Sequence, residues 1–159
     1  MYHWEWQDIE LEFWTPREFK YPEMMAVVQL RFMDELRRRC GFPLHNNGDG
    51  RLDRDMLRIY PELTLATMPD SAHWVRGPSP ENRVRDCQAN DIEPEGRGIL
   101  PDAEFNRRMG ILAQKALELK NEDSFPDVGV ELADRHVHVD TFVDRVRARR
   151  PWYWVGKSR

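Results

Sequence analysis

Segment 134–140 contains the densest group of side chains that could bind a metal or move a proton, in the sequence DRHVHVD. Side chains of a strand alternate between faces, so a strand here places His136, His138 and Asp140 together and turns the two intervening valines toward a core. Residues two apart lie about 6.6 Å from each other between Cα atoms, which lets one site use both imidazoles. One histidine could bind a metal while its neighbour serves as acid, base or oxyanion donor, with Asp140 orienting the ligand ring. Alone, the pair is also typical of hydrogen-bonded histidines on an edge strand.

Two upstream segments supply further ligands. His73 lies in an expected loop, and Asp91 lies in a short strand expected over 88–92. Together with His138 they form a His, Asp, His set, and three protein ligands leave the fourth tetrahedral position of zinc open for water. The chain has only two cysteines and no CxxC pair, so a thiolate zinc site is not expected. We expect both cysteines to be buried free thiols.

The elements that position these ligands alternate between helices and strands without a regular βαβ order. Apolar periodicity and turn residues predict helices over about 22–39, 53–60 and 101–119, and strands over 43–52 (ending in a glycine-rich turn), 88–92, 127–132 and 136–140. This mixture predicts an α+β fold, with a small antiparallel sheet flanked by helices.

The order of the three ligands resembles that of the zinc D-Ala-D-Ala metallopeptidases. These carboxypeptidases and phage endolysins are grouped with lysostaphin-type and hedgehog-type domains. Ser71, His73 and Gly77 stand where the family has its SxHxxG motif, with one more residue between the histidine and the glycine than in the motif. Residues 89–92 resemble its AxDI strand, and 136–140 resemble its final HxH strand. The resemblance implies a hedgehog/DD-peptidase-like fold and a Zn²⁺ site with the same three ligands.

The resemblance also implies roles for residues around the metal. His136 is our first choice for the base, because it shares a strand face with the last ligand. Glu131 and Asp134 are rivals, since relatives often place a carboxylate just before that ligand. Arg51 stands where the family has the arginine of its SGYR motif. It would hold a substrate carboxylate or a developing oxyanion through its planar guanidinium.

The substrate implied by the resemblance is a peptide of bacterial peptidoglycan, cut at or near D-alanine by a carboxypeptidase or endopeptidase. The setting implied is phage or bacterial lysis or a phage tail, with phage structural proteins as further partners. The sequence departs from the family in two further respects: residues 78–88 form an apparent insertion between the first two ligands, and the serine and tyrosine of SGYR are absent. A non-catalytic metal-binding structural or assembly protein is therefore the alternative. The prolines and charged residues of segment 78–88 predict that this segment is an exposed flap beside the metal cleft.

Composition limits the other functions. The 159 residues are 40% hydrophobic and 33% charged with a formal net charge of -4, which predicts one globular domain over 1–159. This charge disfavours binding to nucleic acid or to an anionic membrane. No apolar run approaches the roughly 20 residues of a membrane span, and the aromatic stretch 1–14 lacks the features of a signal peptide. We expect a cytoplasmic protein until its release, or a component of a phage particle.

Two further patterns have ordinary explanations. The basic and aromatic tail 145–159 could grip nucleic acid, but a solvated helix face followed by a core-capping aromatic cluster is favoured. Segment 45–53 resembles part of a calcium loop, yet its first position is His45 and its twelfth is Met56 in place of glutamate. We interpret it as a glycine-rich turn.

Overall fold

The computed structural model describes residues 8–48, 50–68, 73–74, 89–122, 124–125 and 128–141, and the backbone of 153–155. Its elements follow in chain order: η2 (Pro16–Glu18), η3 (Pro22–Met24), α1 (Val27–Cys40), β1 (Leu44–Gly48), α2 (Asp53–Ile59), β2 (Ala89–Pro94), α3 (Asp102–Lys120), β3 (Gly129–Leu132), β4 (Val137–Asp140) and β5 (Tyr153–Val155).

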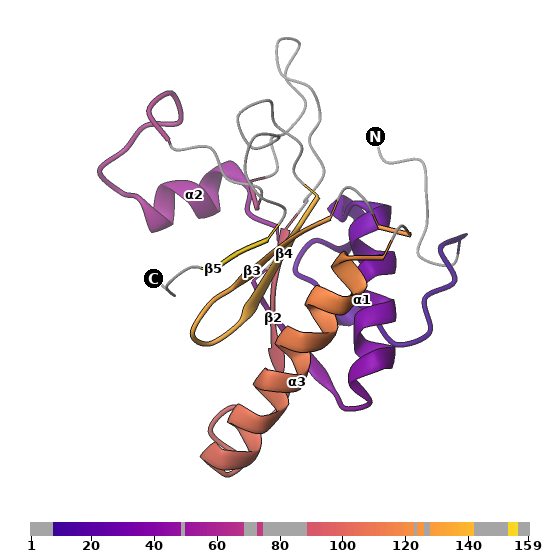
Figure 1. The fold of residues 1–159 in the computed structure, drawn as a ribbon. Coiled ribbons are helices and arrows are strands. Elements are labelled where there is room, and N and C mark those ends of the chain that lie inside the picture. The colour runs from indigo at the N-terminus through magenta and orange to yellow at the C-terminus, as the bar shows by residue number, and fades with distance from the viewer. Residues whose placement is uncertain are drawn as a thin grey trace.

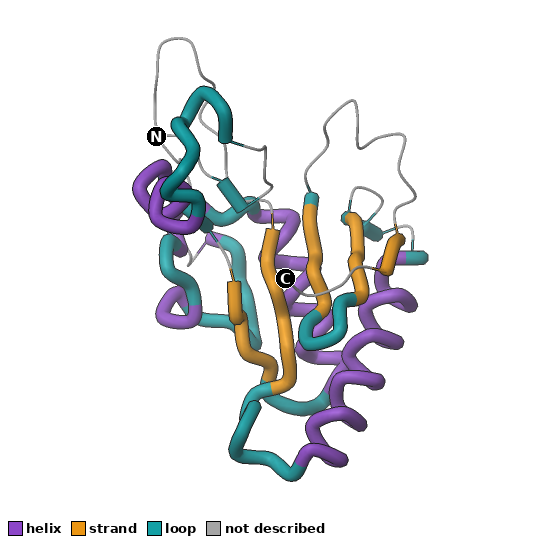
Figure 2. The backbone as a smooth tube through the Cα atoms, turned by 90° about the vertical axis from the view of Figure 1, so that its left-hand side faces the viewer, coloured by secondary structure: helices purple, strands orange, loops and turns teal. Residues whose placement is uncertain are grey.

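The strands form a single sheet in the order β1-β2-β4-β3-β5, and Figure 2 shows them side by side. Its first four strands are antiparallel, which confirms the predicted α+β class and the small antiparallel sheet. The fifth strand, β5, pairs with β3 in parallel at the sheet edge. This edge strand lies within the stretch that we had predicted to be a tail.

Helices α1 and α3 pack against each other and cover one face of the sheet, whereas α2 lies on the opposite side (Figure 1). The main core fills the space between the two long helices and the sheet. Val137 and Val139 of β4 are fully buried in it, as their alternation with the histidines predicted. The opposite face of β4 is therefore free to carry polar side chains.

Helix α1 begins later than the apolar periodicity predicted. Pro22 opens only the 3-10 turn η3, and Met25 and Ala26 have extended backbones, so the α-helix starts at Val27. An uninterrupted helix from Pro22 would have put Val28 on its apolar face, but Val28 is 41% exposed. Gly41 ends the helix in the left-handed conformation, where glycine avoids the clash of a Cβ atom.

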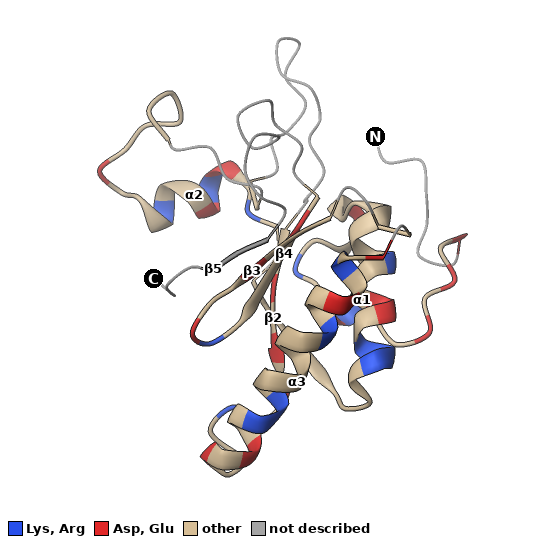
Figure 3. Ribbon diagram, viewed as in Figure 1, with Lys and Arg blue, Asp and Glu red and all other residues tan. Residues whose placement is uncertain are grey.

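Helix α3 agrees with its prediction. Its apolar residues recur at helical spacing, and Leu112, Ala116 and Leu119 are fully buried against the sheet and α1. Helices α1 and α3 carry many basic and acidic residues (Figure 3). Many of these side chains pair within one helix turn, as Arg107 does with Glu104. No helix among the described residues has both the length and the apolar character of a membrane span.

A second, smaller core lies beside α2. It consists of Met56, Met68 and Trp74, with Tyr60 and Leu63 packed against it. Trp74 belongs to the short described segment 73–74, far along the chain from α2. This cluster therefore ties that segment, and the histidine next to the tryptophan, to α2.

Candidate metal centre

Two of the predicted metal ligands are neighbours across adjacent strands. Asp91 of β2 pairs with His138 of β4, on the sheet face opposite the buried valines. The same row continues to Gly48 of β1 on one side and Glu131 of β3 on the other. Directly paired residues of antiparallel strands have Cβ atoms about 4.5–5.5 Å apart. The strand register alone therefore brings these two ligands within reach of one ion.

The third ligand, His73, comes from outside the sheet and is held by its chain neighbours. Its carbonyl oxygen accepts a hydrogen bond of 2.7 Å from the backbone N–H of Arg51. The next residue, Trp74, is buried in the α2 cluster and donates its indole N–H to Asp53 Oδ1 at 2.7 Å. These contacts hold His73 and the residue that follows it, and the His73 side chain lies against Asp91 of β2 and His138 of β4.

The ligand atoms of His73, Asp91 and His138 all lie within 4.8 Å of one another. Asp91 Oδ1 is 2.8 Å from His138 Nδ1 and 3.6 Å from His73 Nε2. Ligand atoms around a tetrahedral zinc ion with bonds of 2.0–2.1 Å are separated by about 3.3 Å, and the two observed distances lie on either side of this value. The donor set and its spacing therefore fit a divalent metal ion such as zinc.

The charges of the metal-free centre are coupled. Burial disfavours the charged form of His138, but hydrogen bonds to Asp140 and Asp91 outweigh it and raise the imidazole pKa to about 9. Burial would raise the pKa of Asp91, yet the two histidines beside it hold that pKa well below its usual range. Burial lowers the pKa of His73. The Asp91 carboxylate thus lies between one imidazole whose pKa is raised and one whose pKa is lowered.

Asp140 contacts the far side of the His138 ring, as predicted from their shared strand face. The ring nitrogen Nε2 lies 3.2 Å from Asp140 Oδ2, while Nδ1 points toward Asp91. Asp140 is itself 4% exposed. A buried carboxylate of this kind fixes the orientation of a ligand imidazole and increases its basicity. In this arrangement Nδ1 is the nitrogen of His138 that faces a metal.

His136 also reaches the centre. Its Nε2 atom lies 3.4 Å from Asp91 Oδ1, outside the group of three donors. Its side chain is 21% exposed, compared with 7% for His73 and 13% for His138. His136 is therefore the most exposed of the three imidazoles around Asp91.

The other predicted catalytic residues lie at different distances from the triad. Arg51 is half-buried beside His73, and its positive charge adds to burial in lowering the pKa of that imidazole. Glu131 is half-buried and paired with His138 on the same sheet face. Asp134 is exposed in the turn between β3 and β4, and within the described part of the chain no hydrogen bond or ion pair joins it to the triad. The fold thus places Arg51 and Glu131 beside the centre and Asp134 outside it.

Gly48 is a residue of the centre that the sequence analysis did not identify. A Cβ atom at this position would lie 2.7 Å from Asp91 Oδ2, which is closer than real Cβ atoms approach. The β1–β2 register also shifts between Asn46 and Gly48, so the strand is irregular at this point. A glycine within a predicted strand is a known sign of close approach by another group. That sign was present in the sequence, but the group opposite could not be inferred.

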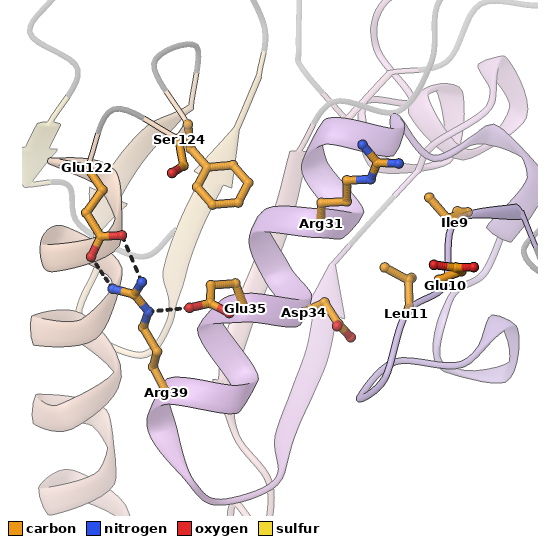
Figure 4. A pocket seen from close by; sticks show the side chains of 10 residues that line it. Ile9, Glu10, Leu11, Arg31, Asp34, Glu35, Arg39, Glu122 and Ser124 are labelled. Atoms are coloured by element: carbon orange, nitrogen blue, oxygen red, sulfur yellow. Dashed lines mark hydrogen bonds and ion pairs between the residues drawn. The ribbon is translucent and has the colours of Figure 1, made fainter.

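A pocket of about 510 Å³ lies elsewhere, between segment 9–11, the outer face of α1 and the end of α3 (Figure 4). Its charged side chains are largely engaged with one another. Arg39 binds both Glu35 and Glu122, and Asp34 accepts the backbone N–H groups of residues 12–14. None of the metal-site residues lines it. The pocket is therefore separate from the candidate metal centre.

Several predictions fall outside the described residues. These are the SxHxxG positions Ser71 and Gly77, the 78–88 flap, Cys87, and most of the 145–159 tail. Cys40 is buried and free, as expected. No family model, curated protein or solved structure matches this chain.

Proposed function

We propose that this chain is a zinc-dependent hydrolase that cleaves peptide bonds in bacterial peptidoglycan, of the D-Ala-D-Ala carboxypeptidase or endopeptidase type. The observation that supports it is the convergence of His73, Asp91 and His138, from three separate parts of the chain, at spacings suited to one ion. The hedgehog/DD-peptidase-like fold, the substrate and the setting in lysis or a phage tail rest on the resemblance of the sequence motifs.

In this proposal each side chain has a separate task. His73, Asp91 and His138 hold the ion, which as a Lewis acid would polarise the scissile carbonyl and make water nucleophilic near neutral pH. His136, near Asp91 and partly exposed, accepts the proton of the attacking water and returns it to the leaving amine.

The remaining charged residues would bind the substrate or replace His136 as the base. The Arg51 guanidinium, beside His73, holds the terminal carboxylate or the developing oxyanion. Glu131, paired with the ligand His138, is the alternative base. Asp134 is the weaker rival, because it lies exposed in the hairpin turn.

Metal analysis combined with a peptidase assay tests this function. We expect one zinc per wild-type chain and release of D-alanine, or cleavage of cross-linked peptides, from purified peptidoglycan. His138→Ala should lose stoichiometric zinc and activity together, because only two ligands remain. His45→Ala, which removes an exposed histidine of β1, is the matched control and should keep both. A chain that binds no zinc at saturation would refute the proposal.

A non-catalytic metal protein is the second candidate, favoured by the absence of the SGYR serine and tyrosine and by the additional residues 78–88. Such a protein would keep one zinc per chain. Stoichiometric zinc without turnover on any peptidoglycan substrate would therefore select this candidate over the hydrolase.

A further inference from the structure

Three amide side chains form a continuous hydrogen-bonded chain on the helix side of the sheet. Gln29 Nε2, from α1, donates to Asn90 Oδ1 of β2 at 3.1 Å and to the carbonyl of Val139 of β4 at 2.8 Å. Asn90 Nδ2 donates to Asn46 Oδ1 of β1 at 3.1 Å, and Asn46 Nδ2 donates to the Glu18 carbonyl at 3.2 Å. One chain of amides thus joins α1 to three neighbouring strands.

This amide chain lies directly behind the metal ligands. Asn90 and Val139 are paired across β2 and β4, and the adjacent pair in the same ladder is Asp91 with His138. Gln29 therefore forms hydrogen bonds to both strands, at the residues next to the two ligands and on the opposite face of the sheet. Through Asn46 the same chain reaches β1, two residues before the irregular position that accommodates the Asp91 carboxylate.

Burying these amides in the core costs free energy, because the amides lose their contacts with water. Gln29 and Asn90 are both 0% exposed, and within the described residues Gln29 Oε1 has no hydrogen-bond partner. Apolar side chains of similar volume would fill the same space without the cost of removing amides from water. Directional hydrogen bonds, however, favour one relative position of two strands, whereas apolar contacts tolerate small displacements. The chain is therefore better suited to fixing geometry than to adding stability.

We propose that Gln29, Asn90 and Asn46 are positioning residues, which fix the separation of β2 and β4 and thereby that of Asp91 Oδ1 and His138 Nδ1. The effect of this positioning on zinc binding rests on the proposed function. The positioning itself concerns the 2.8 Å separation of those two atoms and does not depend on a bound ion.

The variant that tests this proposal replaces two amides at once, Gln29→Met with Asn90→Leu. Removing only one would leave a buried partner unsatisfied, at a cost of about 1–3 kcal/mol that obscures any effect on the site. Asn46 is half-buried, so water can satisfy its amide after the change. Gln114→Met is the matched control, because Gln114 is exposed on α3 and donates only to Glu118.

Two readouts follow in the full-length protein. The first is the pair of ring ¹⁵N resonances of His138 in metal-free protein, identified by their loss in His138→Ala. The second is the zinc dissociation constant, measured by competition with a chromophoric chelator. In the double variant we expect the ring resonances to move and zinc affinity to fall roughly 10-fold, as for other residues that orient metal ligands. Both readouts should stay at wild-type values in the control.

Unchanged readouts in the double variant would overturn the positioning role. A folded double variant with unchanged His138 resonances and unchanged zinc affinity, whatever its melting temperature, would show that the amides are only structural. If the wild type binds no zinc, the proposed function fails, whereas the ring resonances still decide the positioning role. Should the double variant not fold, Asn90→Leu with Asn46→Leu undergoes the same two measurements, because Gln29 Nε2 then keeps its bond to the Val139 carbonyl. Moved ring resonances in that variant support the positioning role, and unchanged ones overturn it.

Discussion

At the level of single residues, the centre depends on small differences in position between chemically similar groups. Three imidazoles surround one carboxylate, with Asp91 Oδ1 between 2.8 and 3.6 Å from a ring nitrogen of each. Only two of these imidazoles complete the group of three donors. The third, His136, is distinguished from the other two by its greater exposure. Two variants test this distinction and the shape of the site.

His136→Ala should leave zinc near full occupancy and lower turnover by roughly 10²–10⁴-fold, the usual loss when a positioned acid or base is removed. The reason is that His136 lies beside the three donors without being one of them. Metal content and steady-state rates of the same preparation measure both effects. A variant that loses its zinc would identify His136 as a ligand.

Gly48→Ala should weaken zinc binding roughly 10-fold with only a small loss of thermal stability. The added methyl would lie 2.7 Å from Asp91 Oδ2, and the short carboxylate side chain can rotate away at little cost to the fold. Zinc competition and thermal melting measure the two quantities. Gly110→Ala, at an α3 position with open space around it, is the control and should leave zinc affinity unchanged. Wild-type affinity in Gly48→Ala would contradict the role assigned to this glycine.

At the level of elements, α2 is joined to the rest of the molecule by few but specific contacts. Asp55, the third residue of α2, accepts hydrogen bonds from Lys20 Nζ at 2.8 Å, Tyr21 Oη at 2.9 Å and the Leu52 backbone N–H at 3.0 Å. Its side chain is 8% exposed. Because α2 also supports the segment that carries His73, this carboxylate contributes indirectly to the metal centre.

The same carboxylate predicts a pH dependence of stability. Burial opposes ionisation of Asp55, but the hydrogen bonds from Lys20, Leu52 and Tyr21 outweigh it and lower its pKa to about 2. Since the pKa in the folded state lies below its ordinary value of 3.8, the contribution is complete above pH 4 and is lost as pH falls toward 2. Its size is about 2 kcal/mol.

Asp55→Asn should therefore be less stable than the wild type at pH 6 by about this amount, with the difference shrinking between pH 4 and pH 2. Urea unfolding of both proteins across this range gives the free energies of unfolding. A difference that stays constant with pH would show that ionisation of Asp55 does not contribute.

At the level of the whole molecule, the proposed ion would connect the segment held by α2 with the sheet. His73 belongs to the segment tied to α2, whereas Asp91 and His138 belong to the sheet. A ligand that binds only the folded state stabilises it by mass action, by about 2.7 kcal/mol at a free concentration 100 times its dissociation constant. The metal should thus act on the stability of the fold as well as on the reaction.

Chelation of zinc from the saturated protein should lower its melting temperature by roughly 5–10 °C, as expected for this free energy in a chain of this size. His138→Ala should melt at the same temperature with and without EDTA, because it lacks the site. Thermal unfolding followed by circular dichroism measures both proteins. Equal melting temperatures of zinc-loaded and chelated wild type would contradict a folded-state metal site.

The sequence by itself determined the elements whose periodicity is strong and local. The alternation of valines and histidines in β4 predicted which face is buried, and the apolar spacing of α3 predicted its core residues, because both depend only on backbone geometry. The His, Asp, His ligand set could also be proposed from the sequence, because the residue types and their order along the chain were enough to suggest it. The start of α1 could not, because the extended backbone at Met25 and Ala26 overrides a continuous apolar pattern.

Only the tertiary structure decided the relations between distant segments. The pairing of Asp91 with His138 and the irregular approach of Gly48 depend on strand register, and local propensity does not encode register. The support of His73 by Trp74 and α2, and the amide chain from Gln29 to Asn46, likewise join residues far apart in sequence. Such contacts arise from the packing of whole elements, and single residues such as Gln29 acquire a role only once those elements meet.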